Sequence, residues 1–401
     1  MYDVVVVGAR CGGGSIALLL ARRGFRVLLL DKDHFPSEMR RSTHFIHQRG
    51  VACLARWGLR PALVATGAPA ITRAVLNMGL VTLAGTMPAV DGETQAFAPR
   101  RLLLDAILVS AAVAAGAELR EGCTVDGLTF SEGCVTGVTG VSASGFHFSE
   151  SATLVIGADG PTSTVAASVG ATYCTETPAL QGTAWTYWDR VLVDHLELHL
   201  RDFEAVYAFP TSDDATLVGA NWAMDRFRTV RPTIESAYLD LLGRAAPDLA
   251  EQVRCSRRRD DKLHLGSTRN FVRKAVGPGW VLLGDAHYKK DPCTAQGMTD
   301  AFCDVEALLA AIDASLSGSR DLTETLSRYE QARVARAMPY YEFTCQLATF
   351  APPSAEHAAL LFALQGNQIE TERFIGLITE ATSPTEFFAH ENSAHQSVGH
   401  L

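Results

Sequence analysis

The chain has 401 residues, of which 47% are hydrophobic and 20% are charged, a composition typical of a globular protein with length enough for two domains. Its formal net charge of −9 argues against a nucleic acid as partner. No apolar run is long enough to span a bilayer, so integral membrane association is not expected. The nine cysteines form no C-x-x-C pair and predict reduced thiols in a cytoplasmic protein.

The first 31 residues predict a dinucleotide-binding unit. An apolar run at residues 4–7 predicts a buried parallel strand, expected to begin at Tyr2, which leaves no room for a targeting segment. A glycine-rich turn, the helical stretch "SIALLLARRG" and a second apolar run ending at Asp31 follow. The order strand, turn, helix, strand and acid is that of a nucleotide-binding βαβ unit.

The turn is a variant of the G-x-G-x-x-G fingerprint. Gly8 and Gly13 take its first and third places, and Arg10 takes the second. A helix that starts here offers free N–H groups and a positive dipole end to a phosphate, and Arg10 adds a cation. Asp31 lies where a ribose-binding acid is expected. The sequence therefore predicts a phosphate cradle, although this motif alone leaves FAD and NAD open.

The middle of the chain alternates between helical and strand patterns. A helix is expected at about residues 48–57, short β-like runs within 61–98, and a helix over "RRLLLDAILVSAAVAAG". Short alternating strands near Glu118, Thr124, Val135 and His147 predict a β-meander, and "ATLVIGADG" predicts another buried strand.

The second half begins with alternating strands over residues 182–221, which predict an antiparallel sheet in a second domain. A helix is expected at about residues 234–244. The stretch "GWVLLGDAHYKKDPCTAQGMTDAFCDVEALLAAI" then predicts strand, loop and helix. The remainder is expected to be mostly helical and to end in a polar tail from about Glu391.

Three later stretches resemble those of a known family when they are taken with the fingerprint. They are "GADGPTSTV", "VYAFPTSDDATLVG" and "GDAHYKKDPCTAQGMTDAF", in this order. Together they resemble the FAD-dependent monooxygenases of the aromatic-hydroxylase (p-hydroxybenzoate hydroxylase-like) type and the related geranylgeranyl reductases, over nearly the whole chain. The resemblance implies that the cradle binds FAD, with NAD(P)H as the reductant.

The resemblance also implies an α/β fold. We expect a Rossmann-like FAD-binding domain with a parallel sheet and a β-meander, a substrate domain with an antiparallel sheet, and C-terminal helices. The FAD-binding domain is expected at 1–75, 96–175 and 270–350, and the substrate domain at 76–95 and 176–269. C-terminal helices are expected at 351–390 and a flexible tail at 391–401.

The resemblance assigns the FAD contacts residue by residue, with Asp285 on the ribityl chain and the helix at Gly297 pointing its N-terminus at the flavin. The expected cofactor-binding residues are Gly8, Arg10, Cys11, Gly12, Gly13, Asp31, Lys32, Thr43, Arg101, Asp159, Gly160, Gly284, Asp285, Pro292, Ala295, Gly297 and Met298. This chain has Ala166 where the family commonly has an arginine, and Ala295 where it has a glycine. No pattern of metal ligands is visible, so no metal site is expected.

Two residues are predicted to be catalytic. "VYAFP…G" resembles the Y-x-W-x-F-P…G motif of the reductases, which lines their substrate cavity, with Tyr207 in place of the tryptophan and Gly219 at its end. His44 lies in "RRSTHFIH", where the family brings a loop close to the flavin, and it could serve as acid or base.

The expected function is that of a monooxygenase of secondary metabolism. A flavin C4a-hydroperoxide formed from O2 would hydroxylate or epoxidise a hydrophobic, aromatic or polycyclic small molecule. The alternative is a geranylgeranyl-reductase-like enzyme acting on C=C bonds, which the Tyr207 motif favours, although no C-G-G segment is visible. A flavin halogenase is less favoured because "WTYWDRV" lacks the Ile-Pro of W-x-W-x-I-P. The substrate and the oligomeric state stay open.

Overall fold

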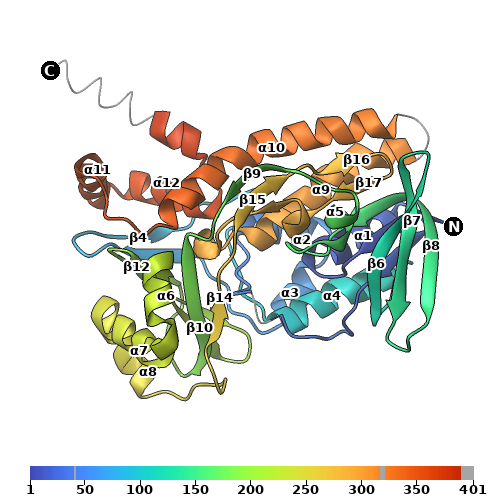
Figure 1. The fold of residues 1–401 in the computed structure, drawn as a ribbon. Coiled ribbons are helices and arrows are strands. Elements are labelled where there is room, and N and C mark those ends of the chain that lie inside the picture. The colour runs from blue at the N-terminus through green and yellow to red at the C-terminus, as the bar shows by residue number, and fades with distance from the viewer. Residues whose placement is uncertain (40–41, 317–320, 390–401) are drawn as a thin grey trace.

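The computed structural model describes residues 1–39, 42–316 and 321–389. The tail predicted from residue 391 lies outside them. The described residues form two lobes with a layer of C-terminal helices along one side (Figure 1). Within the described ranges, no helix combines the length and the apolarity that crossing a bilayer requires.

The first lobe is built on a sheet whose central strands are parallel, as predicted. Its order is β16-β17-β8-β1-β2-β5, and Val4 of β1 lies between Val27 of β2 and Leu154 of β8. The strands are β1 (Tyr2–Val7), β2 (Val27–Leu30), β5 (Glu118–Arg120), β8 (His147–Gly157), β16 (Val276–Gly277) and β17 (Trp280–Leu282).

Both faces of this sheet are covered, which is why its strands are continuously apolar. Val4 and Val6 pack against the helices, and Val5 and Val7 pack against the meander. The helices are α1 (Cys11–Arg22), α4 (Arg101–Ala114) and α9 (Gly297–Leu316); the meander adds β6 (Cys123–Ser131) and β7 (Cys134–Ser142) to β8. The strand near Glu118 was expected in the meander, and that is wrong: Glu118 pairs in parallel with Leu28 of β2.

The second lobe is a seven-stranded sheet of order β14-β10-β13-β12-β11-β3-β4. Its strands are β3 (Arg73–Asn77), β4 (Thr82–Thr86), β10 (Gln181–Asp189), β11 (Leu196–Arg201), β12 (Glu204–Thr211), β13 (Ala215–Ala223) and β14 (His264–Gly266). All neighbours are antiparallel except β3 and β11, because β3 enters from an earlier excursion of the chain. Three helices cover its outer face: α6 (Met224–Val230), α7 (Ile234–Ala245) and α8 (Pro247–Arg254).

The two lobes are joined by a small third sheet of order β18-β15-β9, in which Asn270 lies opposite Thr177. Its strands are β9 (Tyr173–Thr177), β15 (Asn270–Arg273) and β18 (Tyr288–Lys289). β9 takes the chain into the second lobe and β15 brings it back, so the two crossings are hydrogen-bonded to each other (Figure 1).

The remaining elements are helices and short 3₁₀ turns. α2 (Gln48–Arg56) follows the predicted loop of His44, and α10 (Leu322–Leu347) runs along the first lobe (Figure 1). The others are α3 (Arg60–Val64), α5 (Thr164–Ser168), α11 (Ala355–Gln365), α12 (Gln368–Thr379) and the 3₁₀ turns η1 (Arg231–Thr233), η2 (Gly284–Ala286) and η3 (Pro292–Thr294).

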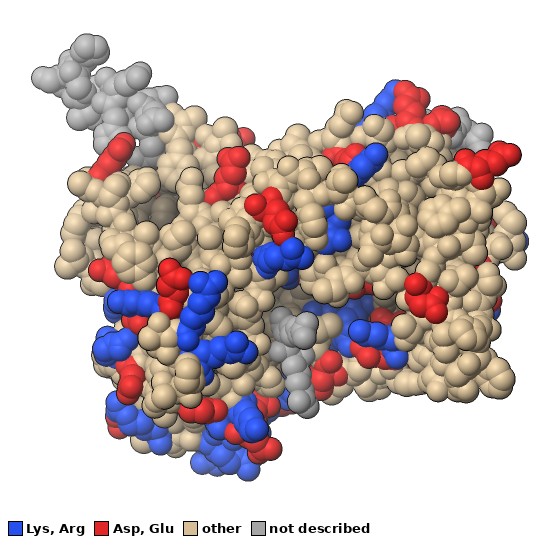
Figure 2. Space-filling view, viewed as in Figure 1, with Lys and Arg blue, Asp and Glu red and all other residues tan. Residues whose placement is uncertain are grey.

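Lys and Arg side chains gather over the lobe of α7 and α8 (Figure 2). The arginines of the segment that follows α8 have carboxylate partners: Arg257 and Arg259 pair with Asp189, and Arg258 pairs with Glu235. These three arginines therefore belong to ion pairs, which contribute little to stability when exposed.

Candidate active site

The turn between β1 and α1 has the geometry of a phosphate cradle. Gly8 has φ 96°, and a Cβ there would lie 2.5 Å from the Ala158 carbonyl oxygen. A Cβ on Gly13 would lie 1.6 Å from the Gly8 oxygen, so both positions require glycine. No described side chain caps the N-terminus of α1, so its first N–H groups remain available to an anion. These features fit the pyrophosphate of a dinucleotide.

Asp31 at the end of β2 holds the cradle to the next loop. One oxygen of its buried carboxylate accepts the Ala9 N–H at 2.7 Å, and the other accepts the Asp33 N–H at 2.9 Å. Burial raises the pKa of Asp31 above its ordinary value. Lys32 beside it is exposed. That Asp31 binds the ribose stays a prediction.

Arg10 fastens the cradle to two neighbouring segments. Its Nη1 donates to Asp105 of α4 at 2.6 Å, and its Nη2 donates to Asp33 and to the Ser37 hydroxyl, both at 2.9 Å. The guanidinium also lies 5.5 Å from the centre of the Phe35 ring. The side chain thus points to the loop of residues 33–37 and to α4, and its contact with FAD stays a prediction.

Asp105 is the centre of this cluster. It is fully buried and also accepts two hydrogen bonds of 3.0 Å from Arg101, the other predicted phosphate ligand. The Cys11 thiol lies 3.6 Å from the same carboxylate, and burial raises the pKa of Cys11 to about 12. Sequence reasoning missed Asp105, whose only signal was its place one helical turn after Arg101.

The change Arg10→Gly restores the usual fingerprint, but it is expected to weaken the protein. It removes one of two cations from a buried carboxylate and frees the loop of residues 33–37, at a cost of about 1–3 kcal/mol. We expect a lower free energy of unfolding and weaker FAD binding that is less sensitive to salt. Denaturant titration and flavin fluorescence at two salt concentrations measure both; tighter FAD binding in the variant would contradict this role. Arg23→Gly, which breaks an exposed pair with Asp313, is the control.

The "DG" turn contains a buried carboxylate oxygen. Asp159 Oδ2 accepts the N–H groups of Thr164 and Val165, while Oδ1 is buried with no partner among the described residues. Gly160 beside it has φ 80°. No guanidinium can come from Ala166, which is packed in the apolar core. Instead Arg273 of β15 donates to the Pro161 carbonyl at 2.9 Å, so a distant residue supplies a cation at this turn, which the local sequence did not reveal.

The "GD" loop presents an ion pair. Asp285 is one third exposed and accepts a hydrogen bond of 2.6 Å from Lys289, which puts a cation beside the predicted ribityl ligand. Gly284 before it has φ 59°. Further on, the turn at Pro292 ends with Ala295 at φ 54°, the position where the family has a glycine. This left-handed conformation suits a glycine and costs an alanine about 1–2 kcal/mol.

α9 begins at Gly297 directly after this turn. Gly297 is exposed, and a Cβ on it would meet no atom within 4 Å, so there is free space beside the first residue of the helix. Met298 is buried and anchors the first turn in the core. The open N-terminus fits an electron-rich ring edge such as that of a flavin.

His44 is held in a strained conformation by a hydrogen-bonded chain. It has φ 51°, and its Nδ1 lies 3.2 Å from the Ala98 carbonyl oxygen. Because a carbonyl only accepts, Nδ1 carries the proton. Nε2 therefore accepts from the Tyr187 hydroxyl at 2.7 Å. Burial lowers the pKa of His44 to about 3, so the ring is neutral near pH 7. Thr43 beside it is half-buried.

Aromatic side chains line the inner face of the large sheet, opposite the loop of His44. Trp185, Tyr187, Tyr207 and Phe209 are buried there in one cluster with Phe45. Tyr207 shares a hydrogen bond of 3.1 Å with Thr183, and burial raises its pKa. A Cβ on Gly219 would lie 2.0 Å from the Tyr207 ring, so the closing glycine of the motif makes room for this ring.

The loop of His44 also reaches the turn at Pro292. His47 Nε2 lies 2.9 Å from the Thr294 carbonyl oxygen, and Ala295 packs against the aromatic cluster. The structure therefore brings the His44 loop, the turn at Pro292 and the aromatic face together, but it pairs His44 with Tyr187 and not with Tyr207. The alternating "WTYW" pattern was the signal for Tyr187.

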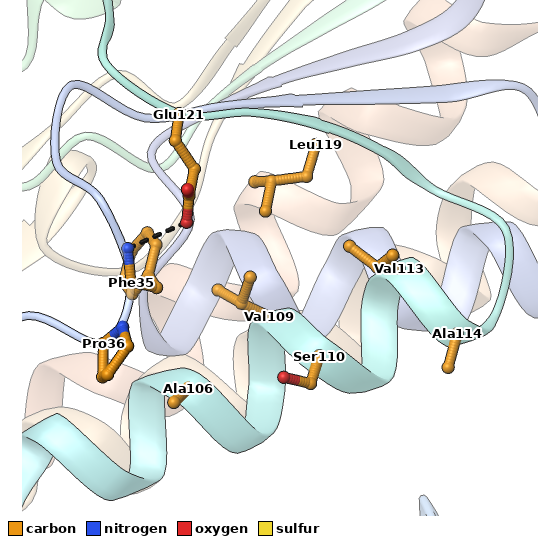
Figure 3. Close-up of a pocket in the computed structure, with 9 residues that line it drawn as sticks. All are labelled: Phe35, Pro36, Ala106, Val109, Ser110, Val113, Ala114, Leu119 and Glu121. Atoms are coloured by element: carbon orange, nitrogen blue, oxygen red, sulfur yellow. Dashed lines mark hydrogen bonds between the residues drawn. The ribbon is translucent and has the colours of Figure 1, made fainter.

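A cavity of about 380 Å³ lies elsewhere, between α4 and the loop of residues 33–37 (Figure 3). Aliphatic groups line most of it, and Glu121 at its edge accepts the Phe35 N–H at 2.8 Å. It contains none of the predicted site residues.

Comparison with known proteins agrees with this geometry. Residues 1–344 match the family described as FAD binding domain. The chain is 24% identical over 347 residues to digeranylgeranylglycerophospholipid reductase of Methanocella arvoryzae, covering 84% of this chain and 83% of that protein. It is 32% identical over 175 residues to rifampicin monooxygenase of Streptomyces venezuelae, covering 43% of this chain and 35% of that protein.

Solved structures confirm the predicted fold. The flavin-dependent brominase Bmp2 superposes with a TM-score of 0.83 at 17% identity, over 99% of both chains. At this identity the likeness concerns the fold alone. Because the family match covers most of the chain, this protein belongs to the FAD binding domain family of FAD-dependent oxidoreductases.

Proposed function

We propose that this protein is an FAD-dependent monooxygenase that inserts one atom of O2 into a hydrophobic, aromatic or polycyclic small molecule, with NAD(P)H as reductant. The observation that carries this proposal is the aromatic inner face of the large sheet, which meets the loop of His44 and the turn at Pro292 in one apolar cluster. A flat apolar substrate would find large ring surfaces there and little water.

One group of residues would bind the cofactor, and another group would exclude water from the reaction. The cradle of Gly8 and Gly13 would hold the pyrophosphate, Asp285 the ribityl chain, and the start of α9 the ring edge. Bound FAD would supply the activation of O2 after its reduction. Trp185, Tyr207 and Phe209 would exclude water and orient the substrate.

The protonation of the site favours oxygen insertion over reduction of a C=C bond. Such a reduction needs a proton donor beside the substrate carbon. His44 is neutral near pH 7 and both of its ring nitrogens are engaged. Burial raises the pKa of Tyr207, which makes its phenol a weaker proton donor than an exposed tyrosine. We therefore assign His44 and Tyr207 positioning roles in the proposed reaction, rather than the acid or base role expected for His44.

The second candidate is a flavin reductase acting on C=C bonds. It is favoured by the extent of the similarity, since the digeranylgeranylglycerophospholipid reductase aligns with 84% of this chain and the monooxygenase with 43%. It is also favoured by the reductase-like Phe209-Pro210 motif, whose closing Gly219 makes room for the Tyr207 ring.

Isotope labelling separates the two candidates. We expect turnover with NAD(P)H and ¹⁸O₂ to place one labelled oxygen atom in the product, detected by mass spectrometry across a panel of aromatic and polyprenyl compounds. Conversion under anaerobic conditions, with a gain of two hydrogens and no label, would contradict the monooxygenase and support the reductase.

Two tryptophans of β10 provide a matched pair of variants for this test. Trp185 faces the proposed substrate side, whereas Trp188 faces the outer helices and donates to the Tyr238 hydroxyl. Trp185→Leu is expected to raise the fraction of O2 released as hydrogen peroxide, because the aromatic face then admits water. Trp188→Leu is expected to lower stability while leaving that fraction unchanged.

A further inference from the structure

We propose that the protein has a second ligand site, a small-anion site for a carboxylate or inorganic oxyanion, in a polar cavity between α2, α9, α10 and the end of α12. The cavity has a volume of about 110 Å³. The residues that decide its chemistry are Arg49, Asp300, Arg333, Arg336, Tyr340 and Glu380. None of them belongs to the predicted FAD or substrate site.

Arg333 lines this cavity and has an unused donor. It is 2% exposed, pairs through Nε with Asp304, and lies 4.4 Å from the centre of the Tyr288 ring. Its Nη2 is buried and has no hydrogen-bond partner among the described residues. A buried guanidinium N–H left without an acceptor is costly, and an oxygen atom of a ligand would satisfy it.

Arg49 adds a positive charge without a carboxylate partner. Its Nη2 donates to the Glu380 backbone carbonyl at 3.0 Å, and no ion pair within 4.0 Å joins it to a carboxylate in the described ranges. Arg49 is half-buried at the start of α2 and lines the cavity together with Arg333 of α10.

Each carboxylate in this cluster has a cationic neighbour. Lys290 lies 3.0 Å from Asp300 and 3.1 Å from Glu380, and Asp304 is shared by Arg333 and Arg336. Among the groups joined by these contacts, four cations (Arg49, Lys290, Arg333 and Arg336) meet three carboxylates (Asp300, Asp304 and Glu380), an excess of one positive charge. The exposed Glu386, which also acts on Tyr340, is not among these groups. A single bound anion would neutralise the cluster.

The size and the donors of the cavity define the class of ligand. A volume of about 110 Å³ accommodates acetate or phosphate but no large organic molecule. Planar guanidinium groups suit the paired oxygens of carboxylate, phosphate or sulfate better than a monatomic ion. Ordered water is the competing occupant.

The site is placed to influence the flavin region. Lys290 lies two residues before Pro292, and Asp300 lies in the first turn of α9. Arg49 follows His47, which contacts the Thr294 carbonyl. An anion would therefore tie together the segments that lead into the turn at Pro292.

The test is calorimetric titration of the FAD-loaded protein with sodium acetate, and separately with inorganic phosphate, at constant ionic strength in chloride. With FAD bound, the cradle cannot take up the phosphate. We expect one saturable site per chain, and a thermal midpoint that rises with acetate or phosphate but not with chloride alone. Arg49→Gln is expected to weaken binding about tenfold or more.

Arg22→Gln is the matched control, because Arg22 also donates to a single backbone carbonyl, that of Trp57 at 2.7 Å. It is expected to bind like the wild type. If Arg49→Gln fails to fold, the exposed Arg336→Gln takes its place and the same loss is expected. Absence of saturable binding, equal binding in the site variants, or equal loss in Arg22→Gln would overturn the proposal and leave water as the occupant. None of these results depends on turnover.

Discussion

Replacing Gly13 by alanine is expected to separate α1 from β1 and to abolish FAD binding. The new Cβ would lie 1.6 Å from the Gly8 oxygen, 2.8 Å from the Gly8 carbonyl carbon and 3.2 Å from Val6 Cγ1. The first two atoms are backbone, so no side-chain rotation relieves the contact, and the helix has to move. Ile16 and Leu20 of α1 are fully buried and would lose their packing. We expect a loss of about 3–5 kcal/mol in the free energy of unfolding.

Gly12→Ala is the control for this prediction. A Cβ at Gly12 would lie 3.6 Å from Leu283 Cδ2, which is an ordinary contact, and alanine favours a helix over glycine by about 1 kcal/mol. The free energy of unfolding should therefore stay the same or rise in this variant. Denaturant titration together with the flavin content of the purified protein measures both changes. A Gly13→Ala protein with full flavin content and unchanged stability would contradict the close approach of α1 to the turn.

The parts of the fold that sequence patterns predicted are those with strong local periodicity. The helices expected at about 48–57 and 234–244 correspond to α2 (Gln48–Arg56) and α7 (Ile234–Ala245). The three-stranded sheet that joins the lobes was not predicted. Its strands are short, and their pairing joins residues as far apart as Thr177 and Asn270. A short strand carries too few alternating residues to define its partner.

The site could be predicted where the backbone dictates the residue. Gly8 and the residue at 295 occupy turns with positive φ, and Gly13 lies where the start of α1 closely approaches Gly8, so a motif identifies these positions. Partnerships between side chains could not be predicted in the same way. Arg10 meets Asp105 across 95 positions, and His44 meets Tyr187 across 143. These contacts depend on how α4 and β10 are placed by the whole fold.

Acidification is expected to lower the free energy of unfolding through three buried histidines. Burial lowers the pKa of His44 to about 3, of His47 to about 4 and of His287 to about 3. In the unfolded chain these rings take up a proton near pH 6.5, whereas in the folded chain they stay neutral to much lower pH. Each histidine therefore removes about 1.4 kcal/mol of stability per pH unit as the pH falls from 6.5 towards its folded pKa.

Buried carboxyl groups have the opposite effect, because their protonation in the folded state raises the free energy of unfolding as the pH falls. Burial raises the pKa of Asp291 to about 7, so the folded state binds that proton first and gains stability as the pH falls from 7 towards 4. Burial also raises the pKa of Asp31, Asp159, Asp304 and Glu380. The dependence of the wild-type stability on pH is therefore the sum of destabilising contributions from histidines and stabilising contributions from carboxyl groups. A comparison of the wild type with a variant of one histidine measures the contribution of that histidine.

His287 is the histidine best suited to this comparison. Its Nδ1 donates to the Arg273 carbonyl at 2.6 Å, its Nε2 is buried with no partner in the described ranges, and Arg333 further disfavours its protonation. His287→Asn keeps a donor for the Arg273 carbonyl but cannot take up a proton. The free energy of unfolding of this variant should therefore rise relative to the wild type by about 1.4 kcal/mol per pH unit below 6.5, or about 2 kcal/mol at pH 5.

The control is His147→Asn, at an exposed position, whose free energy of unfolding should follow that of the wild type throughout. If the His287→Asn curve also runs parallel to that of the wild type between pH 7 and 5, His287 takes up its proton at the same pH in the folded and the unfolded chain, which would require an acceptor at Nε2 and would place a polar ligand or water between His287 and its arginine neighbours.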